Sequence, residues 1–363
     1  MKIVDIKTGR ISVPLKTPFK TALRTVTAVN DTIVQIITDT GQVGFGEAPP
    51  TGVITGDTTG SIEGAIAAHI RPALVGMDMD DFEDVLIKLN ACVVGNNSAK
   101  AACDMALYDL FGQNLTAPVY KLLGGGKASI TTDITVSVNE PAVMAEDSKK
   151  AVALGYKTLK IKVGTDARAD LERMKAIREA VGHGVDLRID ANQGWKPKEA
   201  IRLIGQMEDA GLNIEFVEQP VHRLDFGGMK QVTDNVATPI LADESVMSPM
   251  DAFTIMQMRA ADMVNIKLMK TGGIYNALKI CAAAEVYDVP CMIGCMLEAK
   301  VSVTAAVHLA AAKKVISIID LDGPVLCSED PVHGGAVFKE WEISLPDAPG
   351  LGITRVDGLL PND

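Results

Sequence analysis

The sequence predicts an α/β protein built on a TIM-type barrel, with a second, smaller α+β domain. Strand-like and helix-like segments alternate between residues 130 and 320, and a residue near the end of each strand recurs at intervals of 24 to 28 residues. Each interval accommodates one strand, one helix and two short loops. Eight such units at near-constant spacing are typical of a barrel of parallel strands, and 363 residues also leave room for another domain.

The barrel strands are expected at residues 130–138, 158–163, 185–190, 214–218, 239–243, 263–268, 290–294 and 316–320. An open, doubly wound sheet has the same alternation and is the alternative at this point. That fold class usually carries a glycine-rich dinucleotide fingerprint, which the sequence lacks, so the barrel is favoured.

The N-terminal region has a different pattern. Strands are expected at residues 3–14, 31–38 and 42–47, and helical periodicity extends from about residue 61 to residue 123. The segment 17–30 is too long for a hairpin turn, so we expect a mobile loop there. A run of three glycines ends at residue 126. We therefore expect domains at 1–126 and 127–324, and a C-terminal segment, 325–363, that packs back on the first domain.

Composition excludes several classes of partner. The formal net charge is −11, which disfavours binding to nucleic acid or to an anionic membrane surface. No apolar run is long enough to cross a bilayer, and the first residues alternate like a strand and do not resemble a secretory signal. The six cysteines form no CxxC pair, so we expect reduced thiols and a cytoplasmic location.

Three acidic residues stand at the ends of consecutive barrel strands. They are Asp190, Glu218 and Asp243, and barrel enzymes place their chemistry at this end of the strands. Three convergent carboxylates repel one another unless a cation lies between them. Oxygen ligands favour Mg²⁺, with Mn²⁺ as an alternative, and zinc is not expected because the five histidines all miss the strand ends.

Lysines stand at two other strand ends. Lys160 and Lys162 share one face of the second strand, and Lys267 ends the sixth, on the opposite side of the barrel. An exposed edge strand would also account for the first pair. In a barrel, however, a substrate carboxylate on the metal would place its α-carbon between Lys162 and Lys267. One amine would remove the α-proton and the other would return a proton to the opposite face, which gives the epimer.

Two other lysines lie near these strand ends, and only one of them is expected to support this chemistry. Lys160 is expected to hydrogen-bond the substrate carboxylate and, by charge repulsion, to favour loss of a proton from Lys162. Lys270 is expected to pack near the following loop or to pair with an acid, and not to act in catalysis.

Five motifs in combination resemble the enolase superfamily, muconate-lactonizing subgroup. They are Lys160-x-Lys162, Asp-x-Asn-x-x-Trp at 190–195, Glu-Gln-Pro at 218–220, Asp-Glu-Ser at 243–245 and the run at 265–273. The resemblance covers nearly the whole chain. It implies a modified TIM barrel, (β/α)7β, with an α+β capping domain, Mg²⁺ on the three acids at 190, 218 and 243, and a homo-oligomer.

Within this superfamily, Asp320-x-Asp322 on the last strand resembles the dipeptide epimerases. The resemblance implies that this pair holds the ammonium group of a dipeptide, which suits two carboxylates at one strand end. A solvated barrel rim is the alternative. The resemblance also implies that Thr135 reaches the substrate and that a loop lines its carboxylate region, formed by Cys295, Met296 and Leu297.

Two N-terminal stretches, 18–25 and 54–57, resemble the loops of Ala-Glu epimerases. Arg24 would pair bidentately with a glutamyl side chain, or it is simply a surface residue. The resemblance therefore implies an isomerase that epimerises L-Ala-D/L-Glu in murein peptide metabolism. A different dipeptide, a cycloisomerase and an o-succinylbenzoate synthase stay open as alternatives. A Schiff-base lyase would need no metal, and a non-catalytic metal-binding scaffold would need no paired lysines.

Overall fold

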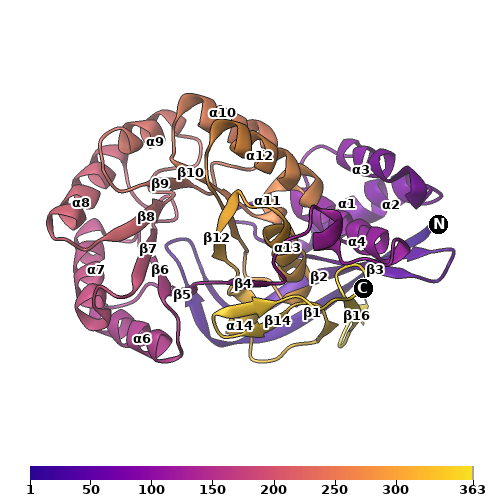
Figure 1. The fold of residues 1–363 in the computed structure, drawn as a ribbon, viewed down its shortest axis with the longest axis horizontal. Coiled ribbons are helices and arrows are strands. Elements are labelled where there is room, and N and C mark those ends of the chain that lie inside the picture. The colour runs from indigo at the N-terminus through magenta and orange to yellow at the C-terminus, as the bar shows by residue number, and fades with distance from the viewer. Residues whose placement is uncertain (362–363) are drawn as a thin grey trace.

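The barrel consists of eight parallel strands in a computed structural model that describes residues 1–361 (Figure 1). Its strands run in the spatial order β12 to β5, and no ladder joins the two end strands within the described chain, so the barrel is nearly closed. The predicted fold class is confirmed. The strands are β5 (Ile134–Val136), β6 (Thr158–Lys162), β7 (Asp186–Asp190), β8 (Ile214–Glu218), β9 (Ile240–Ala242), β10 (Met263–Ile266), β11 (Cys291–Gly294) and β12 (Ile316–Asp320).

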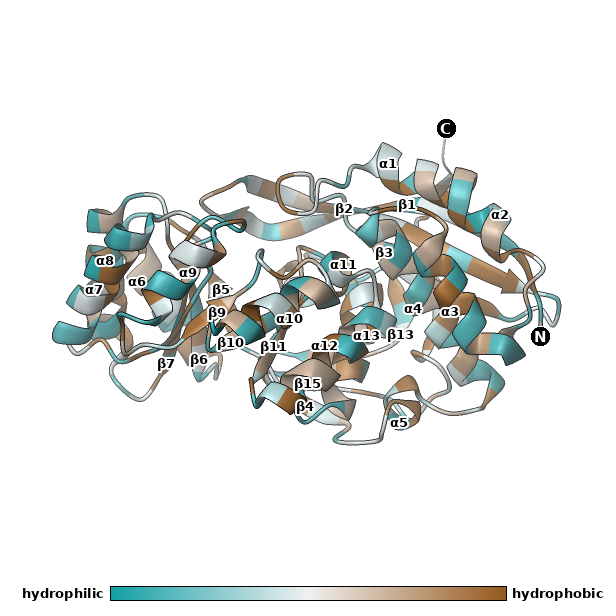
Figure 2. Cartoon of the chain, turned by 90° about the horizontal axis from the view of Figure 1, so that it is seen from above, coloured by the Kyte–Doolittle hydropathy of each residue, from teal (hydrophilic) through white to brown (hydrophobic). Residues whose placement is uncertain are grey.

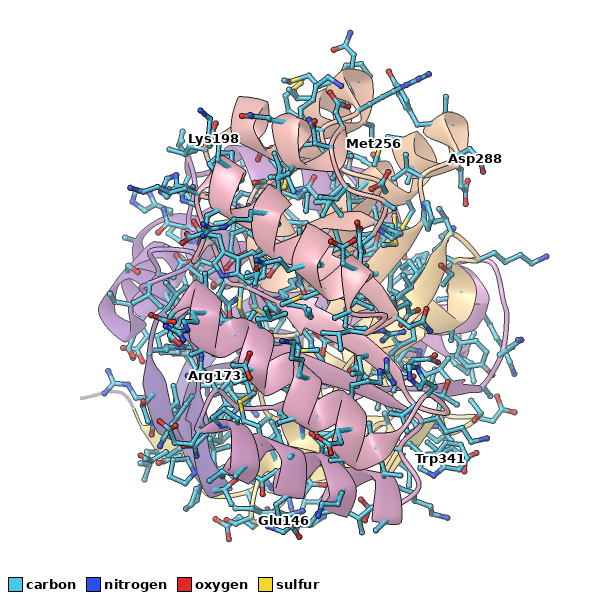
Figure 3. The ribbon with its side chains drawn as sticks, turned by 90° about the vertical axis from the view of Figure 1, so that its left-hand side faces the viewer. Glu146, Arg173, Lys198, Met256, Asp288 and Trp341 are labelled. Carbon is cyan, nitrogen blue, oxygen red and sulfur yellow. The ribbon has the colours of Figure 1, made fainter. Side chains whose placement is uncertain are left out.

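Seven helices follow the first seven strands and cover the outside of the barrel, which gives the (β/α)7β order. They are α6 (Pro141–Ala153), α7 (Ala167–Val181), α8 (Pro197–Asp209), α9 (Phe226–Thr233), α10 (Pro249–Met258), α12 (Ile274–Tyr287) and α13 (Lys300–Ala312). Figure 3 views this outer layer, with Glu146, Arg173 and Lys198 on three successive helices. Two short helices precede α12 and follow β12: α11 (Leu268–Thr271) and α14 (Gly323–Leu326).

The barrel interior below the strand ends is packed with large side chains. Phe216, Leu241, Met263 and Met292 form a small buried cluster from four neighbouring strands. The guanidinium of Arg188 lies 5.4 Å from the centre of the Phe216 ring. Alternation along a strand places Arg188 and Phe216 on the same face as Asp190 and Glu218, two residues further on. This layer is therefore the floor on which the strand-end residues stand.

The N-terminal part contains a four-stranded antiparallel sheet and a group of helices. The sheet order is β17-β1-β2-β3, with β1 (Ile3–Lys20), β2 (Thr25–Thr38), β3 (Val43–Ala48) and β17 (Leu360–Pro361). The helical segments are α1 (Thr59–Ala65), a π-helix (Ile66–Ile70), α2 (Arg71–Leu74), a 3₁₀ turn (Met79–Asp81), α3 (Phe82–Ala91), α4 (Asn97–Asn114) and α5 (Val119–Leu122).

The prediction of a mobile loop at 17–30 is wrong. Strands β1 and β2 continue through this segment as a two-stranded ribbon, with Lys20 paired to Thr25 and a turn closed by the Thr21 amide on the Arg24 carbonyl at 3.0 Å. β-Branched residues in β2 favour the extended backbone there. Figure 2 shows the ribbon extending from the sheet over the barrel. The Lys20 carbonyl accepts the Val138 amide at 3.2 Å, which joins the ribbon to the segment after β5.

The single strand expected at 130–138 is two strands. β4 (Ser129–Thr131) lies outside the barrel and pairs with β15 (Glu342–Ser344) of the C-terminal segment, whereas β5 pairs with β6. Between these two strands, the buried Asp133 accepts a hydrogen bond from Arg188 at 2.7 Å. The C-terminal strands are β13 (Val332–Gly334), β14 (Val337–Lys339), β15 (Glu342–Ser344) and β16 (Ile353–Val356).

The described part of the chain has no helix that is both long and apolar enough to cross a membrane. All six cysteines are free thiols, as expected.

Two glycines let β3 lie directly on helix α4. A Cβ on Gly46 would stand 1.8 Å from the Ala102 carbonyl oxygen, and one on Gly44 would stand 2.1 Å from the Ala106 carbonyl oxygen. No side chain fits between strand and helix at these two positions.

We therefore expect Gly46→Ala to lower the free energy of unfolding by about 1–3 kcal/mol, because the added methyl group must push strand and helix apart. Gly64→Ala is the control, since nothing lies within 4 Å of a Cβ at this exposed position in α1. The control should stabilise the helix by roughly 0.5–1 kcal/mol. Denaturant unfolding of both variants measures the difference, and equal stabilities would contradict the close packing.

Candidate active site

Three carboxylates meet at the mouth of the barrel. Asp190 and Glu218 are the last residues of β7 and β8, and Asp243 directly follows β9. All three are almost fully buried, and each offers an oxygen that lies within 4.8 Å of those of the other two. Adjacent parallel strands bring these residues together because Asp190 and Glu218 stand opposite each other in the ladder. Buried, convergent carboxylate oxygens suit a hard divalent cation such as Mg²⁺.

Four lysine amines neutralise these acids. Lys160 Nζ lies 2.6 Å from Glu218 Oε2 and 3.3 Å from Asp190 Oδ2. Lys162 Nζ lies 2.5 Å from Asp190 Oδ2, and Lys267 Nζ lies 2.8 Å from Asp243 Oδ2. The fourth amine, of Lys270, lies 2.6 Å from the other oxygen of Asp243.

Lys162 and Lys267 stand on opposite sides of the mouth. Strands β6 and β10 are four places apart in the eight-stranded order, so residues at their ends face each other across the barrel. Lys162 is the last residue of β6, and Lys267 directly follows β10. Both side chains are buried, at 6% and 4% exposure. Two amines on opposite sides of one space can reach the two faces of a single carbon atom.

Burial disfavours the charged form of these three acids, and the neighbouring charges decide whether each pKa is lowered or raised. For Asp190, Lys162 and Lys160 outweigh burial and hold the pKa below its usual value. For Asp243, Lys267 and Lys270 outweigh burial and likewise lower the pKa. Burial and the nearby Asp190 raise the pKa of Glu218 to about 8. Glu218 therefore takes up a proton more readily than Asp190 or Asp243.

Neighbouring acids raise the pKa of Lys160 and Lys267. Although burial disfavours the ammonium form of Lys160, Asp320 and Glu218 outweigh it and raise the pKa well above the usual value. Asp243 likewise outweighs burial at Lys267 and raises its pKa. Lys270 is the exception: burial exceeds the attraction of Asp243 and lowers its pKa. Lys270 also donates to the backbone carbonyls of Asn265, at 2.9 Å, and Asp243. Its ion pair with the Asp243 carboxylate is the expected pairing with an acid.

The remaining predicted carboxylates lie at the end of β12. Asp320 Oδ2 accepts from Lys160 Nζ at 2.6 Å, and Asp322 Oδ2 accepts the backbone N–H of Thr135 at 2.7 Å. Burial and the adjacent Asp320 raise the pKa of Asp322 to about 6. The Asp322 bond also links β12 to β5 across the seam of the barrel, where no ladder joins the two strands in the described chain.

One pocket brings together all ten residues that were predicted as catalytic or substrate-binding. It opens between the barrel mouth and the ribbon of β1 and β2. The predicted residues in its wall are Arg24, Thr135, Lys160, Lys162, Lys267, Cys295, Met296, Leu297, Asp320 and Asp322.

Sequence reasoning did not single out several residues of this pocket. Phe19, Leu23, Val53 and Ile54 form an apolar wall beside Arg24. Three of them lie in the stretches 18–25 and 54–57, but a single apolar residue there carries no signal of its own. Asn265 donates to Glu218 Oε1 at 2.8 Å. Its position at the start of the 265–273 motif could have identified it as a partner of an acid.

Arg24 stands at the tip of the ribbon. Within residues 1–361, its guanidinium forms no hydrogen bond or ion pair with the protein, although the residue is partly buried. This burial lowers the pKa of Arg24, and Asp31 acts in the opposite direction. A partly buried guanidinium without an acidic partner is suited to an anionic group of a ligand.

Comparison with known proteins agrees with this geometry. Residues 3–124 match the model of the mandelate racemase/muconate lactonizing enzyme N-terminal domain, and residues 143–357 match the model of the enolase C-terminal domain-like family. The chain belongs to the mandelate racemase/muconate lactonizing enzyme family of the enolase superfamily.

Relatives in this family include several epimerases. The chain is 63% identical to an L-Ala-D/L-Glu epimerase of Clostridium acetobutylicum over 98% of this chain and 100% of that one. A substrate-liganded L-Ala-D/L-Glu epimerase of Bacillus subtilis superposes with a TM-score of 0.97 at 52% identity, over 98% and 99% of the two chains. A dipeptide epimerase of Enterococcus faecalis, complexed with Mg and L-Leu-L-Tyr, gives 0.94 at 43% identity, over 98% and 100%.

We expect Glu218→Gln to weaken Mg²⁺ binding at least about tenfold, because the substitution removes one of three convergent charges. Glu215→Gln on the same strand is the matched control, since Glu215 pairs with Arg188 at 2.8 Å below the site. Isothermal titration with Mg²⁺ measures both affinities without any turnover. Equal affinities in the two variants would contradict the assignment of the metal site.

Proposed function

We propose that this protein is a Mg²⁺-dependent dipeptide epimerase that inverts the α-carbon of the C-terminal residue, with L-Ala-L-Glu and L-Ala-D-Glu as substrates. One observation carries the proposal: a single pocket contains two opposed lysines, a carboxylate pair and an unpaired guanidinium, next to three convergent acids. The names of the Clostridium and Bacillus relatives support the same substrate. A role in murein peptide metabolism follows from this dipeptide.

The two lysines would carry out the proton transfer. The neutral amine of one takes the α-proton, and the electron pair of the broken C–H bond moves into the carboxylate to form an enediolate. The ammonium of the other then donates a proton to the opposite face of the same carbon. Lys162 and Lys267 exchange these roles when the reaction runs in the other direction, so each is a base for one epimer.

The acids and Lys160 would hold the reacting carboxylate. Mg²⁺ bound by Asp190, Glu218 and Asp243 would supply positive charge that stabilises the enediolate. Lys160 lies between Glu218 and Asp320, at 2.6 Å from each, and stays charged there. Its ammonium can donate to the substrate carboxylate as negative charge develops.

The ends of the dipeptide would be recognised by two opposite charges. Asp320 and Asp322 would accept hydrogen bonds from the N-terminal ammonium. The guanidinium of Arg24 would donate two parallel N–H groups to the carboxylate of the glutamyl side chain. A hydrophobic dipeptide is the second candidate, because Phe19, Leu23, Val53 and Ile54 form an apolar wall beside Arg24 and a hydrophobic dipeptide epimerase is 44% identical to this chain.

Three finer assignments are proposals of the same kind. Mn²⁺ would serve at the same site as an alternative to Mg²⁺, because it accepts the same oxygen ligands. The free thiols support a cytoplasmic location. A homo-oligomer is implied by the superfamily resemblance alone.

Incubation with Mg²⁺ and L-Ala-L-Glu in D₂O tests the function. We expect the signal of the glutamyl α-proton to disappear in NMR spectra while the L,D epimer accumulates, because the returned hydron comes from a lysine in exchange with solvent. A library of dipeptides, including hydrophobic ones, is assayed in parallel. No exchange with any member would contradict the proposal, and exchange confined to hydrophobic dipeptides would favour the second candidate.

We expect Arg24→Ala to lower kcat/KM for L-Ala-L-Glu by about 100-fold, because a bidentate ion pair is lost. The loss should be at most a few-fold for an L-Ala dipeptide with an uncharged second residue. Arg71→Ala is the control, since Arg71 pairs with Asp5 on the exposed surface. If the variant kept its preference for glutamate, the specificity would lie elsewhere in the pocket.

A further inference from the structure

Three buried carboxyl groups outside the metal site meet where the N-terminal sheet contacts the barrel. Asp31 belongs to β2, Glu47 to β3 and Glu298 to the segment between β11 and α13. Their side chains are 2%, 0% and 3% exposed. None lines the pocket described above, so the proton transfer does not account for them.

Glu47 accepts hydrogen bonds from the first residues of helix α13. Its Oε1 accepts the backbone N–H of Ala299 at 2.7 Å, and its Oε2 accepts the N–H and the hydroxyl of Ser302 at 2.9 and 3.1 Å. Ala299 precedes the helix and has no capping side chain of its own. A carboxylate at a helix N-terminus is stabilised by the unpaired N–H groups and the helix dipole. The N-terminal sheet thus supplies the cap of a barrel helix.

This helix start is continuous with the loop that lines the pocket. Cys295, Met296 and Leu297 are in the pocket wall, and Ala299 follows two residues later. Glu298 Oε1 accepts the Met296 N–H at 2.6 Å, which fixes the loop from within. A change at Glu47 would therefore release one end of the substrate-lining loop.

We propose that Glu47 is a positioning residue for the loop at 295–297 and that Asp31 keeps it in place by donating a shared proton to its carboxylate. The proposal rests on the function given above only for its kinetic consequences. Ile33 pairs with Glu47 in the ladder of β2 and β3, so Asp31, two residues earlier on β2, stands on the same face of the sheet, diagonal to Glu47. Two buried anions there would repel each other, and a proton on Asp31 supplies the donor that the pair needs.

The surroundings of Asp31 favour its protonated form. Burial and the hydrogen-bonded Glu47 raise its pKa well above the usual value, and Glu298 acts in the same direction. The backbone N–H of Ala299 acts in the opposite sense, as does the attraction between Asp31 and Arg24 on the same ribbon. Cys327, after α14, also lies close, and burial together with Glu47 and Asp31 raises the pKa of its thiol to about 12.

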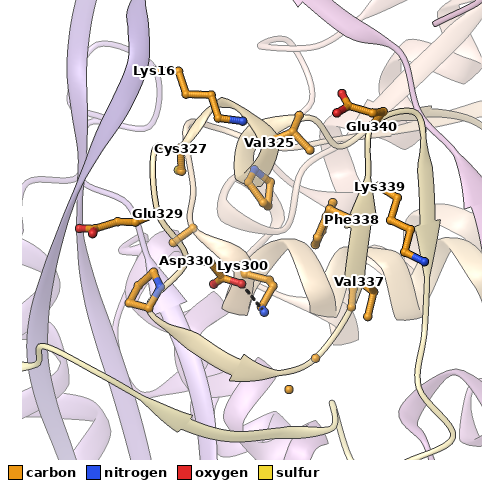
Figure 4. A pocket seen from close by; sticks show the side chains of 16 residues that line it. Lys16, Lys300, Val325, Cys327, Glu329, Asp330, Val337, Phe338, Lys339 and Glu340 are labelled. Carbon is orange, nitrogen blue, oxygen red and sulfur yellow. Dashed lines mark hydrogen bonds and ion pairs between the residues drawn. The ribbon is translucent and has the colours of Figure 1, made fainter. Parts of the chain in front are cut away.

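A surface hollow lies beside this cluster. Figure 4 shows its wall, which includes Lys16, Cys327 and the ion pair between Lys300 and Asp330 at 2.5 Å. Ala299, whose N–H binds Glu47, also lines this hollow. When Asp31 ionises as the pH rises, Glu47 is repelled and the loop loosens, so KM should rise towards alkaline pH.

Three variants test the proposal, and each replaces one carboxyl group by its amide. Glu47→Gln places an NH₂ group against the helix N–H groups. We expect it to raise KM for L-Ala-L-Glu about tenfold with kcat within about twofold, since a hydrogen bond to a charged acceptor is lost. Asp31→Asn retains a donor towards Glu47, so it should preserve KM at neutral pH and abolish the alkaline rise. Asp109→Asn is the matched control.

Asp109 is an equally buried acid of the N-terminal part, but it accepts the N–H groups of Phe45 and Leu351, neither of which belongs to the 295–303 segment. Its variant should leave KM unchanged. Hydrogen exchange of the peptide covering 295–303 is a second measurement that needs no turnover. Exchange should be at least tenfold faster in Glu47→Gln than in wild type, and unchanged in Asp109→Asn.

Unchanged loop exchange together with unchanged KM in Glu47→Gln would overturn the positioning role. If Asp31→Asn raised KM at all pH values, or kept the alkaline rise, the shared proton would be refuted. If the wild-type protein turned over no dipeptide, the proposed function would fail, and the exchange of the 295–303 peptide would still decide whether Glu47 holds the loop.

Discussion

The structure depends on the balance of charge among the buried side chains at the barrel mouth. Two unit charges about 4 Å apart interact by about 4 kcal/mol at an effective dielectric constant of about 20, which is a large part of the roughly 5–15 kcal/mol that stabilises a typical domain. Three convergent carboxylates without nearby positive charge would therefore strongly destabilise the fold. The amines of Lys160, Lys162, Lys267 and Lys270 surround them at 2.5 to 3.3 Å.

The same charges are the ones the proposed chemistry needs. A cation that joins the acids competes with the lysines for the carboxylate oxygens, so metal binding and the proton affinity of the amines are linked. Lys270 does not line the pocket and forms an ion pair with Asp243. It helps to keep this acid ionised, whereas Lys162 and Lys267 line the pocket.

The N-terminal part is joined to the barrel by polar contacts behind the catalytic strands. Asp104 of α4 accepts the N–H groups of Ile274 and Tyr275 at 2.5 and 3.2 Å, at the start of α12, and Glu47 does the same for α13. The pocket residues Lys267 and Cys295 each stand directly after the strand that precedes one of these helices. These contacts therefore join the N-terminal part to the barrel segments that lead out of the pocket.

The strand-end residues could be predicted because parallel strands place their ends at one edge, so Asp190, Glu218 and Asp243 needed only the correct periodicity. The ribbon at 17–30 could not be predicted, because its polar residues resemble a loop. The pairing of each strand of the ribbon also depends on the opposite strand. The split at residues 132–133 places Asp133 against Arg188, and a contact between residues 55 positions apart leaves no local pattern in the sequence. Glu47 and Asp31 gave no signal, since their partners belong to a distant part of the chain.

The central claim is that two lysines act on opposite faces of one carbon, and single-base variants test it most directly. Lys162→Ala and Lys267→Ala are each incubated with either epimer in D₂O. The account predicts that neither variant epimerises, while each still exchanges the α-proton of one epimer only, and that the two variants exchange opposite epimers. Full epimerisation by either variant, or exchange of the same epimer by both, would contradict it.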